Sequence, residues 1–224
     1  MPSVKMPKKS TDTDMTPFVD IAFLILSFFI MATKFKPAEP VEITQPNSVS
    51  ADELPENDAM MVLVDSSDRV FFSVLSDKDK SIFDKVLDKV AASRSMTFTP
   101  EQKQNFRKTV AVGVPFSQLP SFLNLDPEEQ MKVKQPGIPV LDTLNNELIW
   151  WIGAVKSTYA DMGRELKYLV KGDGKTKYPT VEAIINAFKK NDQLKFNFVT
   201  SLEGAPANSE LDLYNRRRVS GGIN

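Results

Sequence analysis

The sequence predicts a single N-terminal transmembrane helix followed by a small α+β domain that is exported across the membrane. Three observations lead to this fold class. Residues 15–35 are almost entirely apolar, residues 36–58 contain several prolines, and from residue 59 onward strand-like and helix-like patterns follow each other. Alternation with a period of two indicates strands, whereas apolar residues spaced three and four apart indicate amphipathic helices. A chain of 224 residues has room for one such domain beside an anchor.

Composition narrows the function classes before any motif is considered. The chain has 28 Lys and Arg against 29 Asp and Glu, so no overall basic charge indicates nucleic-acid binding. It has no cysteine and no histidine, which removes disulfides, thiolate nucleophiles and the commonest general base and metal ligand. Proton chemistry must then fall mainly to Asp, Glu, Lys or Tyr. We therefore expect neither enzymatic activity nor a cofactor or metal site.

The N-terminal part is predicted to consist of a short tail, residues 1–14, and a membrane span, residues 15–35. As a helix, the span is roughly 30 Å long, about the thickness of one hydrocarbon core. A cleaved signal peptide is the alternative, but the residues that follow, TKFKPAEP, contain no small-residue cleavage site. Three lysines precede the span, whereas one lies at its end (Lys34) and one follows it (Lys36), which favours a cytoplasmic N-terminus. The sequence thus predicts a single-pass protein with its C-terminal domain outside the cytoplasm.

Asp20 is the unusual residue of this span. A charged Asp at mid-helix costs about 2.5–3.5 kcal/mol on insertion scales, and such residues usually face protein or water. Thr16 and Ser27 fall within about 40° of Asp20 at 100° per residue, so a thin polar stripe runs along one side. Desolvation would favour the neutral carboxyl, which could then exchange a proton where water reaches it. The alternative is an Asp that merely snorkels to the headgroups from near the helix start.

The stretch DTDMTPFVDIAFLILSFFIMA resembles the N-terminal signature of the ExbD/TolR family. Asp14, Thr16, Pro17, Asp20 and the Phe- and Leu-rich run match that signature in order. The resemblance implies a homodimer whose helices lie inside a ring of a multi-pass ExbB/TolQ-like partner in the inner membrane. It also implies a TonB-like energy transducer and makes Asp20 the proton carrier. Thr16 and Ser27 would be polar neighbours along the proton path.

Residues 36–58 are expected to form an extended, Pro-rich linker. Within them, VEITQP loosely resembles a short hydrophobic–Pro motif of the family that regulates the complex. A plain spacer is favoured over such a motif.

The exported domain is expected over residues 59–215, in the order hairpin, helix, strand, helix, strand. AMMVLVD and VFFSVLS flank the turn SSDR, and SIFDKVLDKVAAS has helical spacing. Residues 93 to about 145 are expected to be an insertion with two short helices, one beginning at Thr99-Pro100 and one at Asp126-Pro127. A helix of about 20 residues is expected after Asp142.

The C-terminal third predicts a strand in ELKYLVKG, a turn in GDGKTKYP, a helix in VEAIINAFKKN and a closing strand in LKFNFVTSL. This order resembles the periplasmic domain of the ExbD/TolR family, in which Asp173 and Tyr178 occupy the places of a recurring D-x-x-x-x-Y pattern. Residues 216–224 are expected to form a tail whose arginines, Arg216 to Arg218, are solvated or contact anionic lipid or a partner.

Three other residue patterns give weaker evidence for a functional site. GDGKT lacks the first glycine of a phosphate-binding loop, because Leu169 stands at that position. Trp150 and Trp151 point to different sides of a helix, so a core role for one is favoured over a ligand platform. Asp65 and Asp68 lie in an expected turn and lack the other ligands of a calcium loop.

Two classes of function remain. The first is an ExbD-like subunit of a proton-driven complex that energises TonB-dependent outer-membrane transport, with a TolR-like role in envelope integrity as its close alternative. The second is a membrane-tethered periplasmic binding module in which the helix only anchors. A flagellar-type stator is less favoured, because no large cell-wall-binding domain follows the linker. Replacement of Asp20 separates the two classes, because an anchor tolerates it and a proton path does not.

Overall fold

The structure is a computed structural model that describes residues 15–32, 41, 43–48, 55, 57–76, 78–142 and 145–202. The chain divides into two units, residues 1–38 and 39–224. The first unit contains helix α1, Thr16–Ala32. The helices of the second unit are α2 Ser81–Arg94, α3 Pro100–Phe106, α4 Leu119–Leu123, α5 Pro127–Lys132, α6 Leu148–Asp161 and α7 Tyr178–Lys190. Its strands are β1 Asn47–Ser48, β2 Ala59–Val64, β3 Val70–Leu75, β4 Lys167–Gly172, β5 Asn197–Phe198 and β6 Ser201–Leu202.

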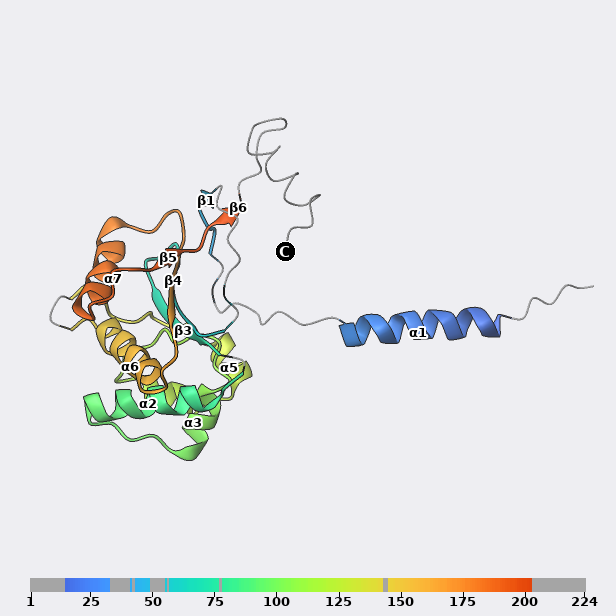
Figure 1. The fold of residues 1–224 in the computed structure, drawn as a ribbon, viewed down its shortest axis with the longest axis horizontal. Helices are drawn as coiled ribbons and strands as arrows, with labels where there is room; N and C mark the ends of the chain where they lie inside the picture. Colours follow the sequence, from blue (N-terminus) through green and yellow to red (C-terminus); the bar gives the residue numbers. More distant parts are fainter. Residues whose placement is uncertain are drawn as a thin grey trace, which may run out of the picture. The chain divides into compact units, whose positions relative to one another are not determined.

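A mixed four-stranded sheet in the order β3-β2-β4-β5 forms the centre of the second unit (Figure 1). Strands β2 and β3 form the predicted antiparallel hairpin, in which Val64 pairs with Val70 beside the turn. Strand β4 runs parallel to β2 over six residue pairs, and β5 runs parallel to β4 over two. The hairpin, the helix after it and the β4–α7 unit are confirmed, and with them the α+β class of the domain.

Helices α2, α6 and α7 pack on one face of the sheet (Figure 1). Alternate strand residues, such as Val62 and Phe72, point to these helices and form the main core with them. Trp151 of α6 is fully buried at its centre, stacked on Phe72 at a centroid distance of 4.7 Å. Trp150 is 43% exposed, so the prediction that one of the pair is a core residue is confirmed.

Helix α6 is shorter than expected. It begins at Leu148 rather than directly after Asp142 and has 14 residues. Asn146 sets this start, because its carboxamide accepts a hydrogen bond from the Leu148 amide at 3.1 Å and donates one to the Ala183 carbonyl at 3.1 Å. The helical start is thus determined by a contact with α7, which is distant in sequence.

The segment between α2 and α6 contains three short helices, α3, α4 and α5, instead of the two expected. Thr99 caps α3 as predicted: its hydroxyl accepts from the Gln102 amide at 3.2 Å, and Gln102 Oε1 accepts from the Thr99 amide at 2.8 Å. Asp126 is the N-cap residue of α5, also as predicted. The segment lies along the outer edge of β3, where Val112 and Phe72 exchange two backbone hydrogen bonds of 2.8 Å.

The closing strand is not continuous, contrary to the expectation from LKFNFVTSL. Asn197 and Phe198 pair with β4, and the Val199 amide donates to the Val170 carbonyl at 2.8 Å before the chain leaves this sheet. Ser201 and Leu202 form β6, which pairs in parallel with β1 from the linker (Figure 1). The linker, expected to be an extended spacer, therefore has a partner strand in the C-terminal part of the domain.

Candidate functional site: a carboxylate-bearing helix and a docked linker

The three candidate proton-path residues lie on α1. Its residues 16–32 are helical throughout, so Thr16, Asp20 and Ser27 share one side as the spacing predicted. The Ser27 hydroxyl donates to the Leu24 carbonyl at 2.9 Å, a local bond that satisfies a polar group on an apolar helix. Asp20 is exposed on this helix. Asp14, which completes the N-terminal signature, lies outside the described residues.

The rest of the α1 surface is apolar. Its large aliphatic and aromatic side chains are each between 51% and 88% exposed, and no residue of α1 is buried. Residues 33–35 of the expected span lie outside the described residues. None of the helices formed by the described residues reaches the combination of length and hydrophobicity that crossing a membrane requires.

A second candidate site lies where the linker docks on the domain. Asp173, in the turn after β4, accepts a hydrogen bond from the Thr44 amide at 2.8 Å. The Gly174 amide in turn donates to the Thr44 carbonyl at 3.1 Å, so both backbone groups of Thr44 are held. Asp173 also accepts from the Lys175 amide at 2.9 Å. The hydrogen bonds from the amides of Lys175 and Thr44 lower the pKa of Asp173, so this carboxylate stays ionised.

Apolar linker side chains cover the face of the sheet that the helices leave open. Val41 and Ile43 pack against a small cluster formed by Leu63, Phe71 and Ala111. This second cluster uses the alternate residues of β2 and β3, those that point away from the main core. The linker is thus part of the domain's packing at residues 41 and 43–46 and is more than a spacer.

Pro46 is one of the residues that line an apolar cavity of about 150 Å³ between the sheet and α7. The cavity is lined by Val64 and Val170 from the strands, by Ile184 and Ile185 from α7, and by Phe198 of β5, among others. The turn that holds Thr44 and this cavity meet at Asp173. The docked linker is therefore held by backbone hydrogen bonds to the turn at Asp173, and its Pro46 contributes to the wall of the apolar cavity.

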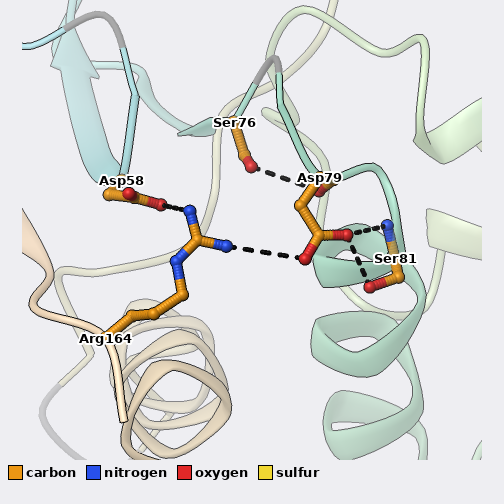
Figure 2. A network of polar contacts seen from close by, with 5 residues as sticks. All are labelled: Asp58, Ser76, Asp79, Ser81 and Arg164. Carbon is orange, nitrogen blue, oxygen red and sulfur yellow. Dashed lines mark hydrogen bonds and ion pairs between the residues drawn. The ribbon is translucent and has the colours of Figure 1, made fainter. Parts of the chain in front are cut away.

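A network of ion pairs holds the point where the linker becomes β2 (Figure 2). Arg164, after α6, is bonded to the Asp58 carboxylate directly before β2 and reaches Asp79 at 3.5 Å before α2. Asp79 also accepts from the Ser81 amide and hydroxyl at 3.0 and 2.7 Å. The Lys167 amide donates to the Asp58 carbonyl at 3.0 Å, which ties the same residue to β4.

The contacts in this network shift the pKa values of its titratable groups. The hydrogen bonds from Ser81 lower the pKa of Asp79, and the Asp58 carboxylate raises the pKa of Arg164. Burial, and then the nearby Asp58 charge, raise the pKa of Tyr159 to about 12, so the phenol beside the guanidinium stays neutral. Asp79 and Arg164 thus remain ionised at neutral pH.

Sequence reasoning found Asp173 through the resemblance but missed Thr44, Asp58 and Arg164. No local signal marks Thr44 or Arg164, because Asp173 lies 129 positions from Thr44, and Asp58 and Asp79 lie 106 and 85 positions from Arg164. Asp58 has a positive φ of 55°, a conformation to which Asn and Asp are better suited than most residues, and that is its only local trace. Tyr178, the other residue of the D-x-x-x-x-Y pattern, is 73% exposed at the start of α7 and does not approach the docked linker by any contact among the described residues.

The remaining candidates have structural roles. Asp65 accepts from the amides of Ser67 and Arg69 and pairs with the Arg69 side chain, and the Asp68 carboxylate accepts from the Lys177 amide. Within the described part of the chain, no group of three acidic side chains is placed to hold a metal ion. Arg216 to Arg218 lie outside the described residues.

An apolar helix with one carboxylate, followed along the chain by a linker that docks on an α+β domain, is typical of a tethered accessory protein. The family described as Biopolymer transport protein ExbD/TolR matches residues 6–203, so the chain belongs to the ExbD/TolR family. Members of this family are accessory proteins of the inner membrane that couple energy to biopolymer transport, and they are not enzymes. Comparison with curated proteins and with solved structures found no match.

Proposed function

We propose that this protein is an ExbD-like, single-pass subunit of an inner-membrane proton-channel complex that powers TonB-dependent outer-membrane transport. The observation that carries this proposal is the place of Asp20: the family match covers it, and it lies on the polar side of an otherwise apolar helix. Residues 15–35 would span the membrane, residues 1–14 would be cytoplasmic, and residues 59–215 would form the periplasmic domain, followed by the basic tail 216–224.

Asp20 carries the chemistry by cycling between its protonated and ionised forms. In the low-dielectric interior of a helix assembly the neutral carboxyl is favoured, and contact with water allows it to release the proton. The membrane potential supplies about 2.3 kcal/mol per charge per 100 mV to drive this transfer. Thr16 and Ser27 add hydroxyl groups to the same side of α1, where they can relay or stabilise the proton.

The identity of the partners rests on membership of the family, and the exposed apolar surface and polar stripe of α1 fit such partners. A carboxylate in lipid needs a protein or water environment, so α1 requires helices around it. A homodimer within a ring of an ExbB/TolQ-like multi-pass protein supplies them. The periplasmic domain then transmits the cycle to a TonB-like transducer. Protons are the only small species that this proposal requires.

The test is Asp20→Asn, which keeps size and polarity but cannot ionise. A matched control is Val19→Asn, which places the same amide on the adjacent residue of α1 and leaves the carboxylate in place. With normal membrane insertion and assembly, we expect Asp20→Asn to abolish energy-dependent uptake through outer-membrane receptors and Val19→Asn to retain it. Retained uptake in Asp20→Asn cells would overturn the proton-carrier role.

Two cell assays separate the ExbD-like role from the TolR-like alternative. Loss of receptor-dependent uptake, with intact resistance of the envelope to detergents, supports the ExbD-like role. Loss of detergent resistance with normal uptake supports the TolR-like one. If Asp20→Asn changes neither, α1 serves only as an anchor, and the domain is better described as a tethered binding module.

A further inference from the structure

The exposed segment Met131–Lys134, here called the MKVK segment, forms an unusual surface on the α+β domain. All four of its side chains are exposed, with Met131 at 43% and Val133 at 44%. Its two lysines make no ion pair with any other described residue. Two apolar and two cationic side chains thus alternate on the surface directly after Gln130, at the end of α5.

Buried glutamines fix both ends of the MKVK segment. Gln130, 3% exposed, accepts a hydrogen bond from the Thr109 hydroxyl at 2.8 Å. Gln135, 5% exposed, accepts from the Gly113 amide at 2.5 Å, and its carbonyl accepts from Arg69 Nη1 at 3.1 Å. The four residues between these anchors are therefore held outward by the fold.

The linker reaches the domain beside this segment. A groove of about 320 Å³ is lined by Val41 of the linker, by Arg69 and Phe71 of the hairpin region, and by residues 131–135. Nine Cα–Cα steps separate Ala32, the end of α1, from Val41. Even a fully extended chain of this length covers at most about 30 Å. While the linker is docked, the chain therefore allows at most about 30 Å between the end of α1 and Val41, which lines the same groove as the MKVK segment.

We propose that the MKVK segment is a membrane-surface contact, which binds the anionic headgroups of phospholipids through Lys132 and Lys134 while Met131 and Val133 enter the interface. The inference rests on the proposed function, because it requires α1 to be inserted in the bilayer. Lysines near an anionic surface and apolar side chains at the headgroup boundary are the two ingredients of such contacts. Glu128 and Glu129 precede the segment on α5, and the Glu129 carboxylate is directed to the Asp126 amide at the opposite end of that helix, at 3.4 Å.

The chain has no cysteine, so single labels can be placed on the full-length protein. We would attach a nitroxide at Met131→Cys, reconstitute the chain in nanodiscs of zwitterionic or partly anionic lipid, and compare its relaxation by lipid-soluble oxygen and by a water-soluble nickel chelate. Labels at Met31→Cys and Leu194→Cys report on α1 and on an exposed residue between α7 and β5. We expect the label at residue 131 to become lipid-accessible in anionic discs only, while the label at 194 stays in water.

Charge variants complete the test. The double variant Lys132→Ala/Lys134→Ala should have a ratio of membrane-bound to membrane-free domain about 25-fold lower than the parent. This corresponds to about fivefold for each lysine. Lys189→Ala with Lys195→Ala removes the same charge from an exposed region elsewhere on the domain and should leave that ratio unchanged. A label at residue 131 that stays water-accessible in anionic discs, while the label at residue 31 is in lipid, overturns the contact and leaves the anchor intact. Water exposure at both positions would mean that the proposed anchor itself fails. Protection at residue 131 only when the multi-pass partner is added overturns the lipid contact in favour of a protein one.

Discussion

Release of the linker by Thr44→Pro gives the most direct test of its docking. Proline lacks the amide that donates to Asp173 at 2.8 Å, so this bond cannot form. Thr44→Ala is the matched control, because it changes an exposed side chain but keeps the backbone amide. The two variants separate the effect of the backbone bond from any effect of the side chain.

The expected magnitude follows from counting Cα–Cα steps along the chain. With the linker docked, the first of the described linker residues that packs on the domain is Val41, nine steps after Ala32. Once it is released, the first residue of the sheet is Ala59, 27 steps after Ala32. The greatest distance that the chain permits between α1 and its attachment point rises from about 30 Å to about 90 Å. A change of this size lies well within the range of pulsed electron paramagnetic resonance.

The assay uses nitroxides at Ala32→Cys and Lys134→Cys on the full chain in detergent, because Lys134 lines the groove that Val41 enters. In the parent protein and in Thr44→Ala we expect only the short distances between the two nitroxides that the nine-step tether allows. In Thr44→Pro we expect a broad distribution that extends to longer distances. Coincident distributions for Thr44→Pro and the parent would refute the conclusion that the Thr44 backbone holds the linker.

Three further predictions concern the domain itself. Trp151→Ala removes a fully buried ring from the core and should lower the free energy of unfolding by about 3–5 kcal/mol in chemical denaturation, whereas the same change at the adjacent, partly exposed tryptophan should cost much less. Burial raises the pKa of Glu147 above its ordinary value of 4.5, so the folded state holds this proton more tightly than the unfolded chain does. The contribution of Glu147 to stability therefore falls as pH rises from 4.5 through the raised pKa. Glu147→Gln keeps an acceptor for the Phe116 amide, and it should abolish this fall when denaturation is measured over a series of pH values. Arg164→Ala should speed hydrogen exchange of the Lys167 amide, and unchanged exchange would show that the ion pairs do not hold the start of β2.

The elements that could be predicted from the sequence are those whose signal is local. The β2–β3 hairpin has nearly continuous runs of apolar residues on both sides of a short polar turn, and α3 has Thr99 and Pro100 at its start. The polar side of α1 follows from residue spacing alone, because a helix fixes which residues share a face. In each case the residues that determine the structure lie within one element or directly beside it.

The remaining features depend on contacts between distant parts of the chain. The start of α6 is set by Asn146 bonding to a carbonyl of α7, and β6 pairs with a linker strand more than 150 residues earlier. Two of the residues that hold the docked linker and the start of β2, Thr44 and Arg164, have unremarkable neighbours in sequence. Such pairings are chosen by the completed fold, and propensity or periodicity does not reveal them.

The position of β2 has a mechanical consequence for a protein of this family. Once the docked residues of the linker are released, force applied through the linker enters the domain at Asp58 and passes directly into β2, which forms six residue pairs with β3 and six with β4. A pull along such a strand loads both ladders together, whereas the docked linker is held at Thr44 by bonds that can separate one after another. The connection is therefore graded: under rising tension the linker gives way first and lengthens, and the folded domain resists as a whole.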